Sequence, residues 1–154
     1  MAYSIDTSAM VDWWVRYYPP ESFPTLVTQI EGLISNGDLR ASREVLDELR
    51  RQDDDLYHWA KNHPDLFVEV TDPVQDAVTA LMDKYFNSEK PEKGISGADP
   101  FVIGLAMTEN PHWTVVSGEK LGSAENAKIP YVCATESVPH ITFLGLIRAQ
   151  GWKF

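Results

Sequence analysis

The chain has 154 residues, of which 44% are hydrophobic and 11% aromatic, enough for one globular domain with its own core. Its formal net charge of −10 argues against a broad nucleic-acid-coating surface but leaves room for a nuclease whose phosphate contacts are local. An apolar run of about 18 residues and a signal-peptide pattern are both missing, so we expect a cytoplasmic protein with no membrane span. The single cysteine, Cys133, agrees with a reducing compartment and excludes a cysteine-based zinc site.

The first part of the chain alternates short extended runs with segments of helical periodicity. Strands are predicted at 3–6 and 39–41. Helices are predicted at 8–17, where Pro19-Pro20 ends the pattern, at 24–36 before Gly37, at 43–51 after a Ser42 cap, and at 56–62. The acidic run at 53–55 is interpreted as a solvated turn between two of these helices.

The second part continues the same alternation. It predicts an extended segment at 66–70 that fits a sheet edge, a helix at 74–86, a polar loop at 87–96 and a very apolar helix at 99–108. Buried strands are predicted at 113–116 and 131–133, and a strand edge followed by a helix at 141–150. Strands that alternate with helices predict an α/β fold with a parallel sheet and right-handed crossovers.

The first predicted strand ends at Asp6, which is followed by Thr7-Ser8 and an amphipathic segment. In open parallel sheets, ligands bind outside the carboxyl ends of the strands, so Asp6 lies where chemistry is usually performed. The alternative is that Asp6 or Ser8 only caps the following helix, since both residue types accept bonds from unpaired N–H groups.

The helix after the second strand carries three acids. At about 100° per residue, Val45 and Leu49 mark the buried direction, so Asp47 points into solvent while Glu48 lies on the flank of the buried stripe. Glu44 lies one turn earlier on the same side, where it could assist Glu48. The alternative is an ordinary solvated surface in which Glu44 favours the helix dipole.

Two further acids occupy equivalent positions later in the chain. Asp99 opens the most apolar helix, where its carboxylate is partly desolvated, although Asp followed by Pro100 is also a common helix start. Glu119 follows the buried strand at 113–116, beside Gly118, which permits a close approach of backbone or ligand.

These positions predict that Asp6, Glu48, Asp99 and Glu119 meet at one end of the sheet. Carboxylates about 5 Å apart repel by roughly 3 kcal/mol per pair at an effective dielectric constant near 20, so some must be protonated or share a cation. A ligand set made only of oxygens favours Mg²⁺ or Mn²⁺. Two such ions can activate water and stabilise the leaving oxygen in phosphodiester hydrolysis.

Several short motifs together resemble the PIN-domain ribonucleases, which include the VapC-like toxins of toxin–antitoxin pairs. The resemblance covers nearly the whole chain. Its marks, in chain order, are I-D-T-S at 5–8, Ser42 followed six residues later by Glu48-Leu49, G-A-D at 97–99, V-V-S-G-E at 115–119, and the closing Lys128-Ile129-Pro130.

The resemblance implies a single PIN-like domain over residues 1–154, folded as a three-layer α/β/α sandwich. It implies Mg²⁺- or Mn²⁺-dependent RNA cleavage, with the family's acidic quartet on Asp6, Glu48, Asp99 and Glu119. The usual fourth acid of the family is Asp, so Glu119 is a departure. Likeness to the toxins also implies a homodimer that is inhibited by an antitoxin protein. The segment 53–86 is longer than in compact toxins.

Two questions stay open at this level. RNA must reach an acidic protein, and several basic residues flank the proposed site in sequence. They are Arg40, Arg43, Arg50, Arg51 and Lys120, with Lys90 and Lys93 in the loop before Asp99. The candidates that we single out for contacting RNA are Arg43, Lys90, Lys93 and Lys120. The alternative is that each is an ordinary solubilising charge.

A PIN-like domain with an inactive site, acting only as a protein- or RNA-binding module, is the main rival to the enzyme.

Overall fold

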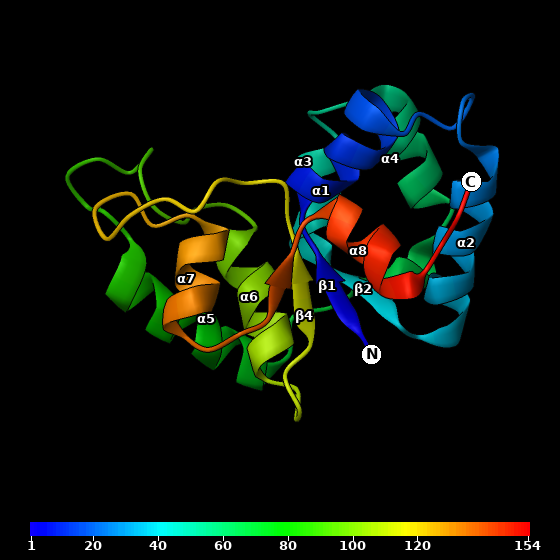
Figure 1. Cartoon of the computed structure of the whole chain (residues 1–154). Helices are drawn as coiled ribbons and strands as arrows, with labels where there is room; N and C mark the ends of the chain where they lie inside the picture. The colour runs from blue at the N-terminus through cyan, green and yellow to red at the C-terminus, as the bar shows by residue number, and fades with distance from the viewer.

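A parallel sheet of five short strands runs through the computed structural model, which describes residues 1–154 (Figure 1). The strands lie in the order β3-β2-β1-β4-β5, and every neighbouring pair is parallel. Their bounds are β1 Tyr3–Ile5, β2 Leu39–Ser42, β3 Phe67–Val68, β4 Thr114–Val116 and β5 His140–Ile141. The central strand β1 is fully buried and pairs with β2 on one side and β4 on the other.

Helices cover both faces of this sheet. Figure 1 shows one group on the left of the strands: α5 (Asp72–Tyr85), α6 (Asp99–Met107) and α7 (Ile129–Thr135). The other group lies on the right: α1 (Thr7–Val11), its π-helical continuation η1 (Asp12–Tyr17), α2 (Pro24–Asn36), α4 (Asp54–Lys61) and α8 (Phe143–Gln150). The short α3 (Arg43–Leu49) and the 3₁₀ turn η2 (Pro64–Leu66) complete the link from β2 to β3. The predicted three-layer α/β/α sandwich is confirmed.

Helix α6 forms the middle of the left-hand layer because it is apolar on nearly every face. It contacts β1, β2 and β4 on one side and α5 on the other. The Ser4 hydroxyl of β1 donates a hydrogen bond of 2.8 Å to the carbonyl of Val102, which satisfies a polar group inside the core. Because α6 is held this firmly against the sheet, its first residue, Asp99, is fixed relative to the end of β1.

Most predicted elements match the structure, and two predicted helix ends are confirmed. Ser42 caps α3 by accepting from the Glu44 N–H, and Gly37 ends α2 in the left-handed conformation. Two interpretations were wrong. Asp53 is not part of a solvated turn but caps α4, where its Oδ1 accepts from the Leu56 N–H at 2.9 Å. Residues 131–133 belong to helix α7, because a short apolar run fits a buried helix as well as a strand.

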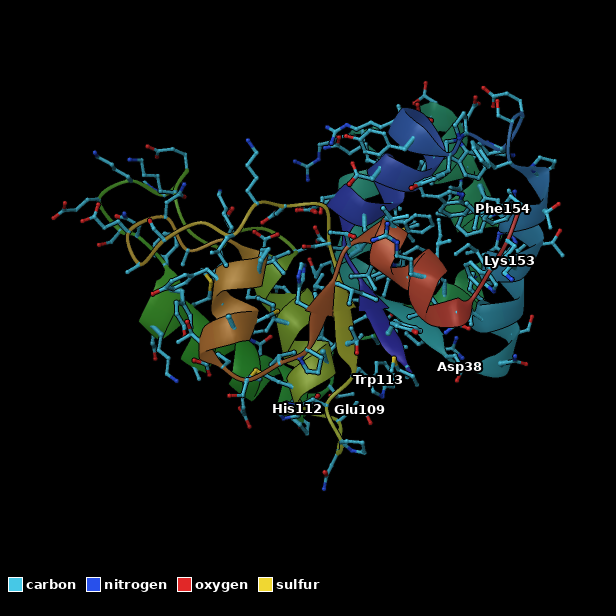
Figure 2. All side chains as sticks on the ribbon, in the orientation of Figure 1. Asp38, Glu109, His112, Trp113, Lys153 and Phe154 are labelled. Atoms are coloured by element: carbon cyan, nitrogen blue, oxygen red, sulfur yellow. The ribbon has the colours of Figure 1, made fainter.

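The amino ends of the strands lie away from the predicted site. Figure 2 labels Asp38 and Trp113, the residues just before β2 and β4, at the end of the sheet opposite α1. The C-terminus folds back on its own domain, with the Phe154 ring edge-to-face against Phe23 at 6.0 Å. No helix combines the length and apolar character needed to cross a bilayer.

Candidate active site

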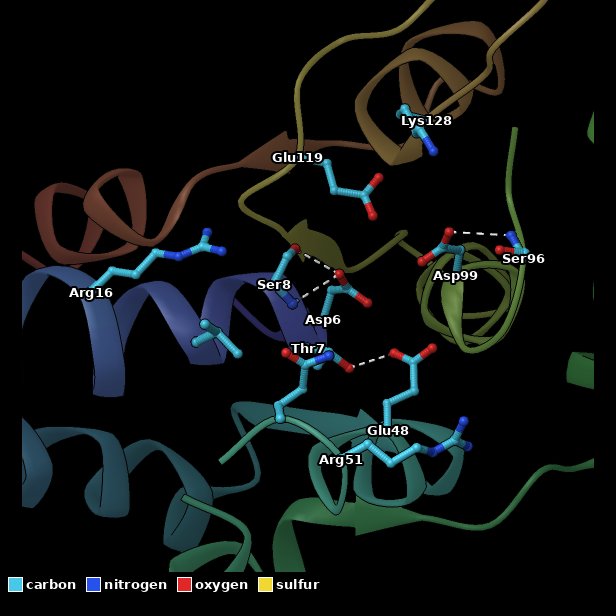
Figure 3. A pocket seen from close by; sticks show the side chains of 12 residues that line it. Asp6, Thr7, Ser8, Arg16, Glu48, Arg51, Ser96, Asp99, Glu119 and Lys128 are labelled. Carbon is cyan, nitrogen blue, oxygen red and sulfur yellow. Dashed lines mark hydrogen bonds between the residues drawn. The ribbon is translucent and has the colours of Figure 1, made fainter. Parts of the chain in front are cut away.

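The carboxyl ends of the central strands open into a polar cavity of about 400 Å³ (Figure 3). Asp6 directly follows β1, Glu48 lies on the helix after β2, Asp99 is the first residue of α6, and Glu119 comes shortly after β4. All four predicted acids line this cavity, and its one hydrophobic lining residue is Val11. The topology therefore brings together side chains that are more than 100 residues apart in sequence.

Three of the four carboxylates converge closely enough to share one ion. Asp6, Asp99 and Glu119 each offer an oxygen, and these oxygens all lie within 4.8 Å of one another. We call these three residues the acidic triad. Asp6 is 2% exposed and Asp99 is 9% exposed, so two members of the triad have lost most of their hydration.

Asp6 uses one oxygen for structure and leaves the other in the cavity. Its Oδ2 caps α1 by accepting from the Ser8 N–H at 3.2 Å and from the Ser8 hydroxyl at 2.7 Å. Ser8 Oγ in turn accepts from the Gly118 N–H at 2.9 Å, which ties β1 to the loop after β4. Asp6 Oδ1 is buried and has no hydrogen-bond partner. The capping interpretation is confirmed for Asp6, and its second oxygen is left without a hydrogen-bond partner.

Asp99 and Glu119, like Asp6, each use one carboxylate oxygen in a hydrogen bond with the protein. Asp99 Oδ2 accepts from the Ser96 N–H at 3.2 Å, so the carboxylate bonds to the preceding loop and does not cap its own helix. Glu119 Oε2 accepts from the Ile129 N–H at 3.2 Å, at the start of α7. Each member of the acidic triad thus has one oxygen in a protein hydrogen bond and one oxygen free.

Burial and mutual repulsion raise the pKa values of two triad members. Burial is the largest cause for Asp6, whose pKa is raised to about 7; the negative charges of Glu119 and Glu48 add to the effect, and the bonds from Ser8 oppose it. The pKa of Asp99 is raised to about 8, first by burial and then by the charges of Asp6 and Glu119. Both carboxyl groups therefore keep their protons to a higher pH than an ordinary aspartate does.

Glu48 occupies a different position from the triad. Its Oε1 accepts from the Thr7 hydroxyl at 2.7 Å and its Oε2 from the Ala98 N–H at 3.1 Å, so both oxygens are already bonded. These bonds join the residue after Asp6 to the residue before Asp99. Gly97 lies against this carboxylate with φ of 56°, and a Cβ there would come within 2.5 Å of Glu48 Oε2. Asp47 is exposed, as the helix phasing predicted.

The remaining predicted residues divide between the cavity and the surface. Ser8 lines the cavity, whereas Glu44 does not. Arg43 lies 3.6 Å from Glu69, outside the cavity. The other three residues predicted to contact RNA are exposed and also outside it; they are Lys90, Lys93 and Lys120.

The cations that do line the cavity are Arg16, Arg51 and Lys128, which we call the cavity cations. Arg51 had a sequence signal, since it follows the helix of Glu48, and Lys128 belongs to the closing motif. Arg16 had none. It reaches the cavity on the π-helical segment η1, whose wider winding changes the direction of side chains relative to an α-helix.

Comparisons with known proteins agree with this fold. A family model described as "Domain of unknown function (DUF4411)" matches residues 3–154. The structure is similar to VapBC2 from Rickettsia felis, solved bound to a DNA fragment from its promoter, with a TM-score of 0.55, 17% identity, and coverage of 92% of this chain and 98% of that one. It is also similar to FitAcB from Neisseria gonorrhoeae, with a TM-score of 0.50, 15% identity, and coverage of 90% and 96%. No curated protein matches the sequence. The resemblance to PIN-domain toxins is confirmed at the level of the fold.

Proposed function

Because the chain belongs to the DUF4411 family, whose description assigns no activity, we propose from the site itself that it is a metal-dependent ribonuclease. In this proposal the acidic triad holds Mg²⁺ or Mn²⁺, and the enzyme hydrolyses internal phosphodiester bonds of RNA. The observation that carries the proposal is the convergence of three carboxylates within 4.8 Å around a buried Asp6 oxygen with no partner.

The donor set fits a hard divalent cation. A buried carboxylate oxygen without a hydrogen bond is costly unless a cation or a proton satisfies it. The free oxygens of Asp6, Asp99 and Glu119 are all hard donors, and the cavity lining contains no histidine or cysteine. Such an oxygen set is typical of Mg²⁺ or Mn²⁺ sites and not of structural zinc.

A bound divalent ion would activate a water molecule and stabilise the leaving oxygen of the phosphodiester. The protein's own residues prepare the site for this chemistry. Ser8 fixes Asp6, the Ser96 N–H fixes Asp99, and the Ile129 N–H fixes Glu119, so the carboxylates do not need to reorganise when a ligand arrives. Glu48 supports the triad and does not itself belong to it. Its hydrogen bonds from Thr7 and Ala98 hold the Asp6 and Asp99 segments at a constant separation.

A cleavage assay tests the assignment directly. Defined single-stranded RNAs are incubated with the protein in Mn²⁺ and in EDTA. We expect cleavage only with Mn²⁺, and a loss of about 100-fold or more in the Asp6→Asn variant. Asp47→Asn is the matched control, because Asp47 is exposed on the same helix as Glu48 and its variant should cleave normally. A protein that neither cleaves RNA nor melts at a higher temperature in Mn²⁺ is the inactive binding module instead.

We also propose that the chain is the toxin of a toxin–antitoxin pair, acts as a homodimer and is inhibited by an antitoxin protein. The sequence motifs support this, as does similarity in fold to the complexes VapBC2 and FitAcB.

Expression in growing bacteria should arrest growth, and Asp6→Asn should relieve the arrest. Light scattering on the purified chain should give twice the monomer mass. Normal growth on expression of a catalytically active protein would refute the toxin assignment.

A further inference from the structure

Three basic side chains surround the acidic triad on different sides. Arg16 comes from η1, Arg51 from the residues just after α3, and Lys128 from the residue just before α7. Figure 3 shows Arg51 on the Glu48 side of Asp6 and Lys128 on the Glu119 side, so the two cations lie on opposite sides of the central carboxylate. Three separate segments of the chain thus supply positive charge to one small cavity.

These cations do not neutralise the acids. Arg51 and Lys128 form no ion pair within 4 Å, and Arg16 pairs with Asp12 at 3.1 Å, which is not part of the cavity lining. The cations are therefore set back from the acids, and Lys128 is half-buried without a partner for its charge.

The cavity is larger than the space that one metal ion needs. A cavity of about 400 Å³ corresponds to roughly a dozen water molecules at about 30 Å³ each, far more than the first hydration shell of one metal ion. None of its lining residues is aromatic, so it offers no platform on which a base could stack. A sugar–phosphate backbone fits such a cavity better than a base.

We propose that Arg51 and Lys128 bind backbone phosphates on opposite sides of the phosphodiester that lies at the acidic triad. A single RNA strand then crosses the cavity from the end of α3 to the start of α7. The inference rests on the proposed ribonuclease activity and deepens it by assigning the strand path. Arg51 presents a planar guanidinium that can bind a phosphate in a bidentate way, whereas Lys128 supplies a point charge.

The test maps each cation to one phosphate. Cleavage in Mn²⁺ first locates the scissile bond in a short single-stranded RNA. Binding is then measured by fluorescence anisotropy in Ca²⁺, which replaces the catalytic ion and suppresses turnover. The RNAs carry a single uncharged methylphosphonate linkage at successive positions around the scissile bond. The proteins are the wild type, Arg51→Met, Lys128→Met and, as a control, Lys153→Met, which alters an exposed residue near the C-terminus and outside the cavity.

We expect Arg51→Met and Lys128→Met each to weaken RNA binding and to reduce the salt dependence of log affinity by about 0.7, the value for one phosphate contact on a single strand. Lys153→Met should leave both the RNA affinity and its salt dependence unchanged. A neutral linkage on one side of the scissile bond should weaken binding by the wild type but not by Arg51→Met. A neutral linkage on the other side should do the same for Lys128→Met.

Three results would overturn the strand path. Both variants could become insensitive to the same linkage, neither could change the salt dependence, or Lys153→Met could behave like them. Metal-dependent cleavage that persists alongside any of these results leaves the proposed function standing and removes only the inference. Wild-type protein that neither binds nor cleaves RNA removes both. The variants' melting temperatures should match the wild type, which separates a lost phosphate contact from misfolding.

Discussion

Replacing Asp6 by Asn should stabilise the metal-free protein at alkaline pH. The pKa of Asp6 is raised from 3.8 to about 7, so folding favours its protonated form. Stability from this group is fully present below pH 3.8 and is lost as the pH rises through about 7, because the unfolded chain then ionises more readily than the folded one. A shift of about three pKa units corresponds to about 4 kcal/mol, an upper figure because Asp6 and Asp99 titrate as a pair.

The amide introduced by Asp6→Asn cannot ionise, yet its oxygen can still accept from Ser8, so the α1 cap is retained. Urea denaturation in EDTA at pH 4 and pH 8 measures the effect. Wild-type protein should lose several kcal/mol of unfolding free energy between these values relative to Asp6→Asn, while the exposed Asp47→Asn control should follow the wild type. The reasoning is refuted if Asp6→Asn is the less stable protein at pH 8, since burial of an unpaired carboxylate would then not be costly.

Three further outcomes follow from the contacts of the site. Glu48→Gln should slow Mn²⁺-dependent cleavage by about 10-fold or more in a single-turnover assay, because an amide cannot accept from both Thr7 and Ala98, whereas Asp47→Asn should not. Gly97→Ala should lower the urea-derived stability by about 1–3 kcal/mol, since φ of 56° is strained for alanine and its Cβ would collide with Glu48; an unchanged stability and Mn²⁺ affinity would contradict the packing. RNA affinity measured by anisotropy should fall at least about 10-fold when EDTA replaces Ca²⁺, and equal affinities would show that metal charge plays no part in binding.

Much of the site was predictable because strand ends are visible in the sequence. Asp6 and Glu119 follow buried strands, and parallel strands end at one edge, so their convergence needs only the topology. Glu48 was separated from Asp47 by helix phasing alone. The same logic could not show that both oxygens of Glu48 are occupied, because their donors, Thr7 and Ala98, lie 41 and 50 residues away.

The sequence did not show which basic side chains line the cavity, for a physical reason. Nearness in sequence to an acid does not fix where a long side chain ends, and the exposed Lys90, Lys93 and Lys120 lie outside the cavity for that reason. Lys128 lines the cavity from the position just before helix α7, and residues 131–133 of that helix were predicted to be a strand. A short apolar run has no period from which the two could be told apart.

The proposed RNA binding requires a local attraction, because the protein carries a net charge of −10. The lining of the cavity carries four carboxylates and three basic groups, so without metal the fully ionised cavity is slightly negative. A single divalent ion reverses that sign, and a second ion makes the cavity strongly positive while the rest of the surface still repels the strand. In the proposed function, metal binding and phosphate binding would therefore be coupled through charge, and the cavity would be where the protein attracts RNA. The raised pKa values of Asp6 and Asp99 oppose this change in charge, because an ion that enters the triad must displace protons, and each proton released offsets one unit of the ion's charge.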